Sequence, residues 1–412
     1  MEKKTIAIAA IAAIIIIAAA AAVILMNNGN GGDDKSSIQI AASDITVSAG
    51  DSAELKVTVT PSKYQKDLVI TPANTDIYSF DNGIVHGLKK GKSTISLTVD
   101  DVKKTVNVNV TGIRVTDHNG KVVELDKPAE RVVVYTKYMA EAFVVLGATD
   151  KVVATSDTVL KDTNIGSYYA GKASVGSSSP QSADVAIANR ADLVILYDGD
   201  ASVYDASKIP VLEIGASKLD EIHADITALG LALGMPEKAS KVLEWFDKYY
   251  KIILDKAPTT DKTIVNTMES WSSTKFRVMG DTSTPGTLMR LAGGNNPFEG
   301  GYVYVDVSTI IETNPDIYYT IMYNAQWNDE GRQIQFDAIT SRAGWENITA
   351  IKNKEVYLIS NDLMGGLRSV IGGMYFLSML NKDCSYDVEQ LMDEFNKLGG
   401  TSFNTHLVYK MS

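Results

Sequence analysis

The chain has 412 residues, a formal net charge of −11 and 45% hydrophobic residues. This length allows two or three domains, and the acidic excess, which is spread along the chain, argues against nucleic acid or an anionic membrane surface as a partner. Cys384 is the single cysteine, so an intramolecular disulfide is excluded.

The first 26 residues predict a transmembrane anchor. Lys3 and Lys4 precede an uncharged apolar run over residues 5–26, and about 20 apolar residues suffice to cross a bilayer as a helix. The two lysines favour a cytoplasmic amino terminus, with the rest of the chain extracytoplasmic at the cell surface. The alternative is a cleaved signal, for which residues 19–22 offer small side chains, although its apolar core is usually only about 7–15 residues. No cysteine lies near the end of the run, so an anchor on a lipidated cysteine is excluded.

A polar, Gly- and Asn-rich stretch at residues 27–37 predicts a flexible linker. Residues 38–112 then contain about seven short segments in which apolar and polar residues alternate, such as AELKVTVT and STISLTVD. This pattern, with β-branched enrichment and polar turns, is typical of an all-β sandwich.

This segment resembles a bacterial Ig-like domain of group 2. The resemblance rests on VSAGD at 47–51, LKVTVTP at 55–61, NGIV at 82–85 and GKSTI at 91–95. It departs where the family often has a tryptophan, since Ile70-Thr71-Pro72 occupies that region. The resemblance implies a spacer or an adhesion module and supplies no chemistry.

From residue 113 the pattern changes to strands alternating with helices, which predicts βαβ units and mainly parallel sheets. Apolar strands are expected at 131–135, 151–154, 192–197, 210–214, 263–268, 316–321 and 355–359. A helix is expected at 139–146 and a long helical stretch at 219–256. Gly234-Met235-Pro236 interrupts that stretch, so it contains either a kink or two abutting helices.

Residues 113–412 resemble the substrate-binding proteins of ABC importers for iron–siderophore complexes, haem and cobalamin. The matching segments in the first half are VTDHNGKVV at 115–123, PAERVV at 128–133, LGATDKVV at 146–153 and ADLVI at 191–195. Those in the second half are AGGNN at 292–296, NPDIY at 314–318 and AIKNKEVY at 350–357. Their order and spacing carry the resemblance.

The resemblance implies two Rossmann-like α/β lobes, at 113–216 and 259–412, joined by a connecting helix at 217–258. It also implies a monomer that captures a ferric siderophore, haem or a corrinoid and delivers it to an ABC permease and its ATPase. No permanently bound cofactor is expected. The sequence shows no G-x-S-x-G elbow, phosphate loop or paired His–carboxylate motif, so we do not expect an enzyme.

Ligands of open α/β sheets lie beyond the carboxyl ends of the strands. This rule selects loops that follow the predicted strands, with aromatic side chains suited to a large chelate and cations suited to carboxylate or catecholate oxygens. The predicted ligand-binding residues are Lys137, Tyr138, Trp271, Tyr302, Tyr323, Trp327 and Arg368. Ordinary packing is the alternative role for each aromatic residue.

A bare metal ion is not expected as the ligand. The histidines are His86, His118, His223 and His406; no two are spaced as a ligand pair, and none follows a predicted strand in the cleft. Any metal would therefore arrive already chelated.

Members of the resembled family carry a surface glutamate on each lobe that docks onto the permease. Asp184 matches the position in the first lobe, whereas Ser308 stands where the second glutamate is expected, with Asp306 or Glu312 as possible substitutes. Asp184 can also be read as a favourable charge at a helix amino terminus. The alternative function is a surface adhesion or structural protein that keeps the two-lobed fold without transport; the Ig-like segment and Ser308 favour it.

Overall fold

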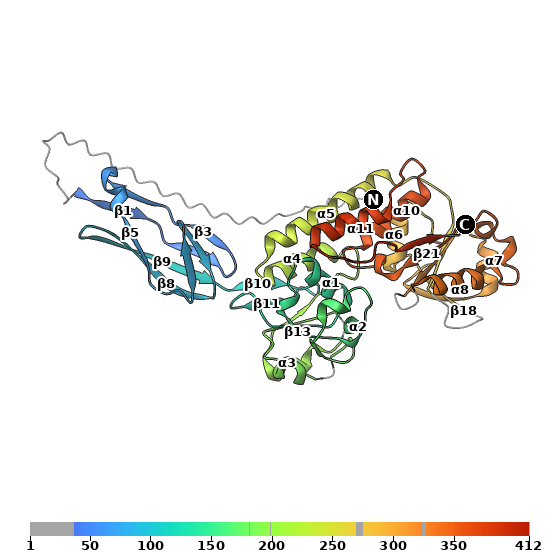
Figure 1. Ribbon diagram of the computed structural model, residues 1–412, viewed down its shortest axis with the longest axis horizontal. Coiled ribbons are helices and arrows are strands. Elements are labelled where there is room, and N and C mark those ends of the chain that lie inside the picture. The colour runs from blue at the N-terminus through green and yellow to red at the C-terminus, as the bar shows by residue number, and fades with distance from the viewer. Residues whose placement is uncertain (1–36, 181, 198, 269–274, 324–326, 412) are drawn as a thin grey trace.

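The computed structural model describes residues 37–411 except 181, 198, 269–274 and 324–326. The predicted anchor or signal at 1–26 lies outside the described residues, as does the linker up to residue 36. The described part forms an elongated molecule with a β domain at one end and two α/β lobes at the other (Figure 1). Within these described ranges, no helix is both long enough and apolar enough to span a bilayer.

The N-terminal β domain, residues 38–112, contains a four-stranded sheet, a three-stranded sheet and a separate strand pair. The strand order is β2-β9-β8-β5 in the first and β3-β7-β6 in the second, with β1 paired to β4. The strands are β1 (Gln39–Ala42), β2 (Ile45–Ser48), β3 (Ser52–Glu54), β4 (Val57–Thr60), β5 (Val69–Pro72), β6 (Tyr78–Asp81), β7 (Ile84–Gly87), β8 (Gly91–Val99) and β9 (Val102–Thr111). Alternate residues of β8 and β9 are buried in one apolar core with residues of β6 and β7, as the period-two pattern predicts.

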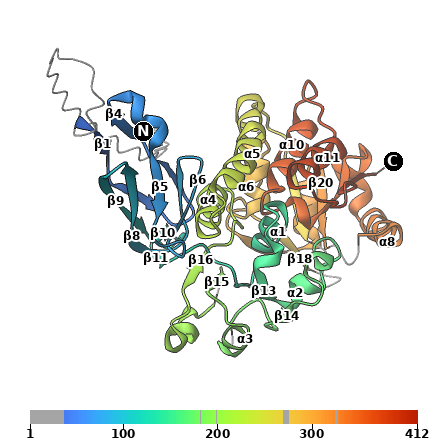
Figure 2. The ribbon, with the colours of Figure 1, turned by 60° about the vertical axis from the view of Figure 1, so that its left-hand side comes forward.

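A short hairpin of β10 (Ile113–Thr116) and β11 (Val122–Leu125) joins this domain to the first lobe. Beside it, a Cβ on Gly50 would lie 3.3 Å from both the Gly234 Cα and the Pro128 Cγ. Figure 2 shows the N-terminal β domain on the side of α4 (Ile222–Ala232), away from the second lobe. The close glycine contact therefore fixes the domain at the corner where α4 ends.

The first lobe has a five-stranded, wholly parallel sheet in the order β14-β13-β12-β15-β16. Its strands are β12 (Val132–Val134), β13 (Val152–Thr155), β14 (Ala173–Ser174), β15 (Leu193–Leu196) and β16 (Val211–Glu213). Its helices are α1 (Lys137–Val145), α2 (Asp157–Leu160) and α3 (Asp184–Ala188). Every residue of β12 and β15 is buried, as expected for parallel strands covered on both faces.

Two abutting helices connect the lobes, α4 and the 21-residue α5 (Pro236–Lys256). The break falls at Gly234, whose φ of +67° suits glycine, and at Pro236, which begins α5 where a missing N–H costs nothing. The buried face of α5 follows the predicted three- to four-residue spacing: Ala239, Val242, Leu243, Phe246, Tyr249 and Ile253.

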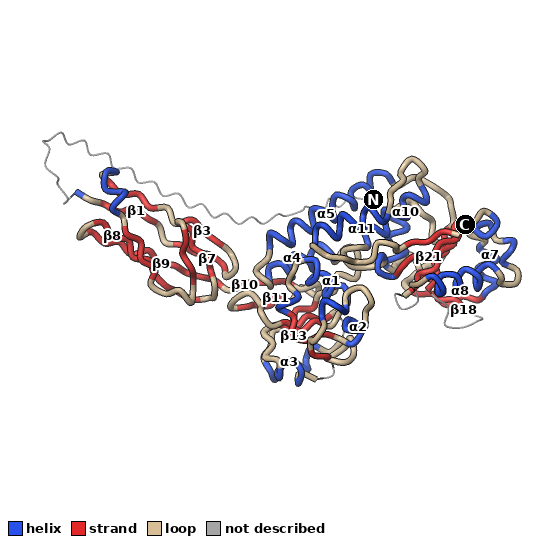
Figure 3. The backbone as a smooth tube through the Cα atoms, in the orientation of Figure 1, coloured by secondary structure: helices blue, strands red, loops and turns tan. Residues whose placement is uncertain are grey.

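The second lobe has a six-stranded mixed sheet in the order β19-β18-β17-β20-β21-β22. Its strands are β17 (Ile264–Met268), β18 (Lys275–Met279), β19 (Tyr302–Asp306), β20 (Ile317–Met322), β21 (Val356–Ser360) and β22 (Val408–Lys410). Its helices are α6 (Thr284–Leu291), α7 (Val307–Thr313), α8 (Asp329–Thr340), α9 (Thr349–Lys352), α10 (Ser369–Leu380) and α11 (Val388–Gly399). The parallel strands β17, β20 and β21 were predicted; β18, β19 and β22 were not, and each pairs antiparallel with a neighbour. Figure 3 shows the sheets of the two lobes as separate bodies.

Candidate functional site

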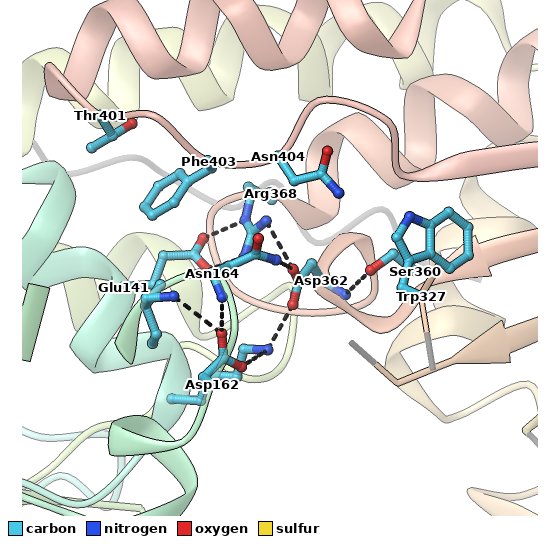
Figure 4. Close-up of polar contacts among 12 residues, drawn as sticks. Glu141, Asp162, Asn164, Trp327, Ser360, Asp362, Arg368, Thr401, Phe403 and Asn404 are labelled. Carbon is cyan, nitrogen blue, oxygen red and sulfur yellow. Dashed lines mark hydrogen bonds and ion pairs between the residues drawn. The ribbon is translucent and has the colours of Figure 1, made fainter. Parts of the chain in front are cut away.

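The carboxyl ends of the two sheets approach each other between the lobes. Lys137 begins α1 directly after β12, and Asp362 follows β21 in the second lobe. Their side chains bond directly, and Figure 4 shows Asp362 within a cluster of polar side chains that lies between the lobes, beside helices of the second lobe. We call this cluster the interlobe network; it consists of Lys137, Glu141, Asp162, Asn164, Asp362 and Arg368.

Arg368 lies at the centre of the interlobe network and is 0% exposed. Its Nε donates to Glu141 Oε1 at 2.9 Å and its Nη2 to Glu141 Oε2 at 2.5 Å. Its Nη1 donates to Asp362 Oδ2 at 3.2 Å. The two-pronged pairing with Glu141 uses the planar fork of the guanidinium and joins α1 of the first lobe to the second lobe.

Lys137 makes a second connection between the lobes. Its Nζ lies 2.6 Å from Asp362 Oδ1 and 2.7 Å from Asp162 Oδ2, and its side chain is 16% exposed. The Asn164 amide also donates to Asp362. Asp362 thus joins Lys137 and Asn164 of the first lobe to Arg368 of its own lobe.

In the interlobe network, burial and ion pairing shift the pKa values of the charged groups in opposite directions. Burial raises the pKa of Glu141, and the adjacent Arg368 guanidinium lowers it in part. Burial would lower the pKa of Arg368, but Asp362 and Glu141 outweigh this and raise it above its usual range. Three carboxylates face two cations, which leaves a formal charge of −1.

Aromatic rings close the network on two sides. The Phe403 ring lies 5.1 Å from the Arg368 guanidinium, in the loop before β22. Tyr138 lies against two glycines of the second lobe; a Cβ on Gly365 would come within 2.4 Å of its ring and one on Gly366 within 2.8 Å. Burial raises the pKa of Tyr138 to about 12, so this phenol is neutral at physiological pH.

The charge of Lys137 should stabilise the fold in a pH-dependent way. Burial would lower the pKa of Lys137, but Asp362 and Asp162 more than offset this, so folding raises it. The resulting stabilisation is complete below the unfolded pKa of about 10.4 and is lost as pH rises through the folded value. We expect Lys137→Met to lower the urea midpoint of unfolding at pH 7–9, and its difference from the unmodified chain to shrink above about pH 10.4.

Lys161→Met is the matched control, because Lys161 pairs with Asp157 at 2.8 Å with 77% of its side chain exposed. Exposed pairs contribute little, so this change should have almost no effect at any pH. A Lys137→Met difference that stays constant from pH 7 to 12 would contradict a role for the charge.

Comparison with known proteins identifies the family. A family model described as "Periplasmic binding protein" matches residues 132–363. The chain belongs to the periplasmic binding protein family. Members of this family bind solutes for transport and are not enzymes.

Among curated proteins, this periplasmic binding protein is 24% identical over 275 residues to YvrC of Bacillus subtilis, an uncharacterized ABC transporter substrate-binding lipoprotein. The match covers 64% of this chain and 83% of the relative.

Solved structures share the fold. The TroA-like periplasmic binding protein FepB of Veillonella parvula matches with a TM-score of 0.62 and 20% identity, over 73% of this chain and 100% of that one. The molybdate-bound MolA of Haemophilus influenzae has a TM-score of 0.58 at 16% identity, over 71% and 99%. A protein of an ABC-type Fe³⁺-hydroxamate transport system of Saccharomonospora viridis has a TM-score of 0.51 at 17% identity, over 65% of this chain and 99% of that one.

The structure of this periplasmic binding protein brings together three of the predicted ligand-binding residues, Lys137, Tyr138 and Arg368. They do not all face an open cleft as expected. Arg368 has no exposed surface, because carboxylates that the sequence analysis did not consider surround it. Ligand contact by these residues stays a prediction, and their observed partners belong to the protein itself.

The other predicted aromatic residues are spread over the second lobe. Tyr323 follows β20 and is 38% exposed, whereas the Trp327 Nε1 donates to the His406 carbonyl at 2.6 Å and its ring packs on the lobe. Tyr302 lies on the edge strand β19, 56% exposed, with the Arg277 guanidinium 3.9 Å from its ring. Trp271 lies outside the described residues. Tyr323 is therefore the aromatic candidate whose position and exposure best suit ligand contact.

The predicted docking positions both lie exposed at the beginning of short helices. Asp184 is the first residue of α3 in the first lobe, and Ser308 is the second residue of α7 in the second lobe. Contact of these two positions with a permease remains a prediction.

Sequence reasoning missed four members of the interlobe network: Glu141, Asp162, Asn164 and Asp362. Two signals could have indicated them. Glu141 is an acid within the apolar run of α1, one turn after Lys137, and Asp362 follows a predicted strand. Across the described ranges, no three His, Cys, Asp or Glu side chains are arranged to hold a metal ion.

Proposed function

We propose that this protein is the extracytoplasmic substrate-binding protein of an ABC importer and that it captures a chelated metal, either a ferric siderophore, haem or a corrinoid. The observation that carries the proposal is the junction between the lobes, where the strand ends of both sheets meet around Lys137 and Asp362. In open α/β sheets this is where ligands bind.

The comparisons support the proposal. The B. subtilis relative is described as an ABC transporter substrate-binding lipoprotein, and one protein of the same fold belongs to an Fe³⁺-hydroxamate transport system. MolA, which binds molybdate, shows that the fold also accepts a small oxyanion, so the ligand class must come from the residues of this chain.

The remaining parts fit delivery at a membrane. Residues 1–26 would hold the protein at the membrane, since the chain lacks a cysteine there for a lipid anchor. The N-terminal β domain, which resembles an Ig-like module, would act as the spacer. Asp184 and Ser308, one on each lobe, would face the permease.

The proposal is tested by isothermal titration of the full-length chain in mild detergent with ferrichrome, haem and cobalamin. We expect saturable binding of one of these ligands at sub-micromolar concentration. Tyr323→Ala should weaken that binding about tenfold, because a buried aromatic contact contributes about 1.5 kcal/mol or more.

Tyr64→Ala in the N-terminal β domain is the matched control and should leave the affinity unchanged. If no metal chelate binds, the transport proposal fails. The alternative, a surface adhesion protein that keeps the two-lobed fold, would then be favoured.

A further inference from the structure

We propose that the site between the lobes selects a metal chelate with no net negative charge, neutral or cationic, and excludes anionic chelates. This inference rests on the proposed function and specifies its substrate class. It follows from how the charges of the interlobe network are already paired.

Both cations of the network are occupied by the protein's own carboxylates. Arg368 bonds to Glu141 and Asp362, and Lys137 bonds to Asp362 and Asp162. An anionic ligand would have to displace one of these carboxylates. It would otherwise face a cluster whose formal charge is already −1.

Arg368 is also held away from any ligand by its surroundings. The Phe403 ring covers its guanidinium, and Glu141, which is 1% exposed, would lose its partner if Arg368 turned away. An unpaired buried carboxylate is strongly unfavourable. Arg368 therefore has a structural role, in its ion pairs with the protein's own carboxylates, and is not available to bind a catecholate or carboxylate oxygen of a ligand.

Lysines that follow other strands near the junction are also paired with carboxylates. After β13, Lys161 pairs with Asp157 at 2.8 Å, and beyond β16, Lys218 pairs with Glu221 at 2.7 Å. Lys275, the exposed cation at the start of β18, lies opposite Asp306 in the strand register.

Electrostatic complementarity sets specificity, and a network whose two cations are already paired with the protein's own carboxylates discriminates against anions by repulsion and desolvation. A neutral or cationic trihydroxamate complex meets no such penalty. A triply charged ferric tris-catecholate would, and so would molybdate.

The test titrates the full-length chain in mild detergent with four probes of different charge: ferrichrome (neutral), ferrioxamine B (cationic), ferric enterobactin (anionic) and molybdate (anionic). We expect the neutral or the cationic complex to bind at least 100-fold more tightly than either anion. Increasing NaCl should weaken binding of ferrioxamine B more than that of ferrichrome.

Asp162→Asn removes one carboxylate from Lys137 and should reduce the preference over ferric enterobactin at least fivefold. Asp255→Asn is the control, because it makes the same charge change on α5 at an exposed pair with Lys251. It should leave the preference unchanged.

The outcomes separate the two proposals. Tight binding of ferric enterobactin or of molybdate would overturn the charge inference. Tight binding of ferric enterobactin, which is a ferric siderophore, would leave the transport proposal standing. Binding of none of these four probes would overturn the charge inference, whereas the transport proposal fails only if haem and cobalamin do not bind either. An equal effect of Asp162→Asn and Asp255→Asn would overturn the assignment of selectivity to the interlobe network.

Discussion

Replacing Arg368 with methionine is expected to lower the free energy of unfolding by about 3–5 kcal/mol. The change removes the partner of Glu141 and one partner of Asp362, both of them fully buried. Urea unfolding followed by tryptophan fluorescence measures this effect. All four tryptophans, at 245, 271, 327 and 345, lie outside the N-terminal β domain, so the signal reports on the two-lobed part.

The control is the double variant Glu141→Leu with Arg368→Met. It replaces the buried ion pair by apolar side chains, and such exchanges are often neutral or stabilising. We expect it to recover most of the stability lost in Arg368→Met. If the double variant is less stable than the single one, loss of side-chain packing, and not the unpaired carboxylate, explains the effect.

Gly366→Ala is expected to cost about 2–4 kcal/mol and to weaken the contact between the lobes. Gly366 has a φ of +66°, which costs alanine about 1 kcal/mol, and its Cβ would come within 2.8 Å of the Tyr138 ring. Such overpacking adds about 1–3 kcal/mol. The urea midpoint measures the loss.

Gly400→Ala separates the backbone cost of a positive φ from the cost of overpacking. Gly400 has a φ of +62° and nothing within 4 Å of an added Cβ, so only the backbone cost of about 1 kcal/mol applies. Equal losses at the two glycines would show that the approach of Tyr138 to the second lobe contributes nothing.

The elements that the sequence predicted well are the fully buried ones. The strands β12, β15, β17, β20 and β21 are buried along their whole length and mostly apolar, because helices cover both faces of their sheets. The interrupted helical stretch resolves into α4 and α5 at Gly234 and Pro236.

The antiparallel strands β18 and β19 were missed because each is only partly buried. In KFRVM and YVYVD charged or aromatic residues alternate with apolar ones. Read alone, such short segments do not differ clearly from loops. Their place in the sheet comes from pairing of β18 with β17 and of β19 with β18, which the local pattern does not encode.

For the site, the rule on strand ends selected three residues that meet between the lobes, but it misjudged the availability of their charges. Lys137, Tyr138 and Arg368 do meet between the lobes. The partner of Arg368 is Glu141, 227 residues away in sequence, and nothing in the local pattern of α1 indicates that pairing. Charge pairing between distant segments requires the tertiary structure.

Because Gly50 of the N-terminal β domain lies close to Gly234, the start of α5 is held beside that domain, and the length of α5 sets the position of the second lobe relative to it. One end of this helix starts beside the N-terminal β domain, and the other leads into the second lobe, about 32 Å away. One inserted residue would turn the second lobe by about 100° and shift it by about 1.5 Å relative to that corner. Arg368 could then no longer reach Glu141. The ion pair between the lobes therefore requires the present number of residues in α5.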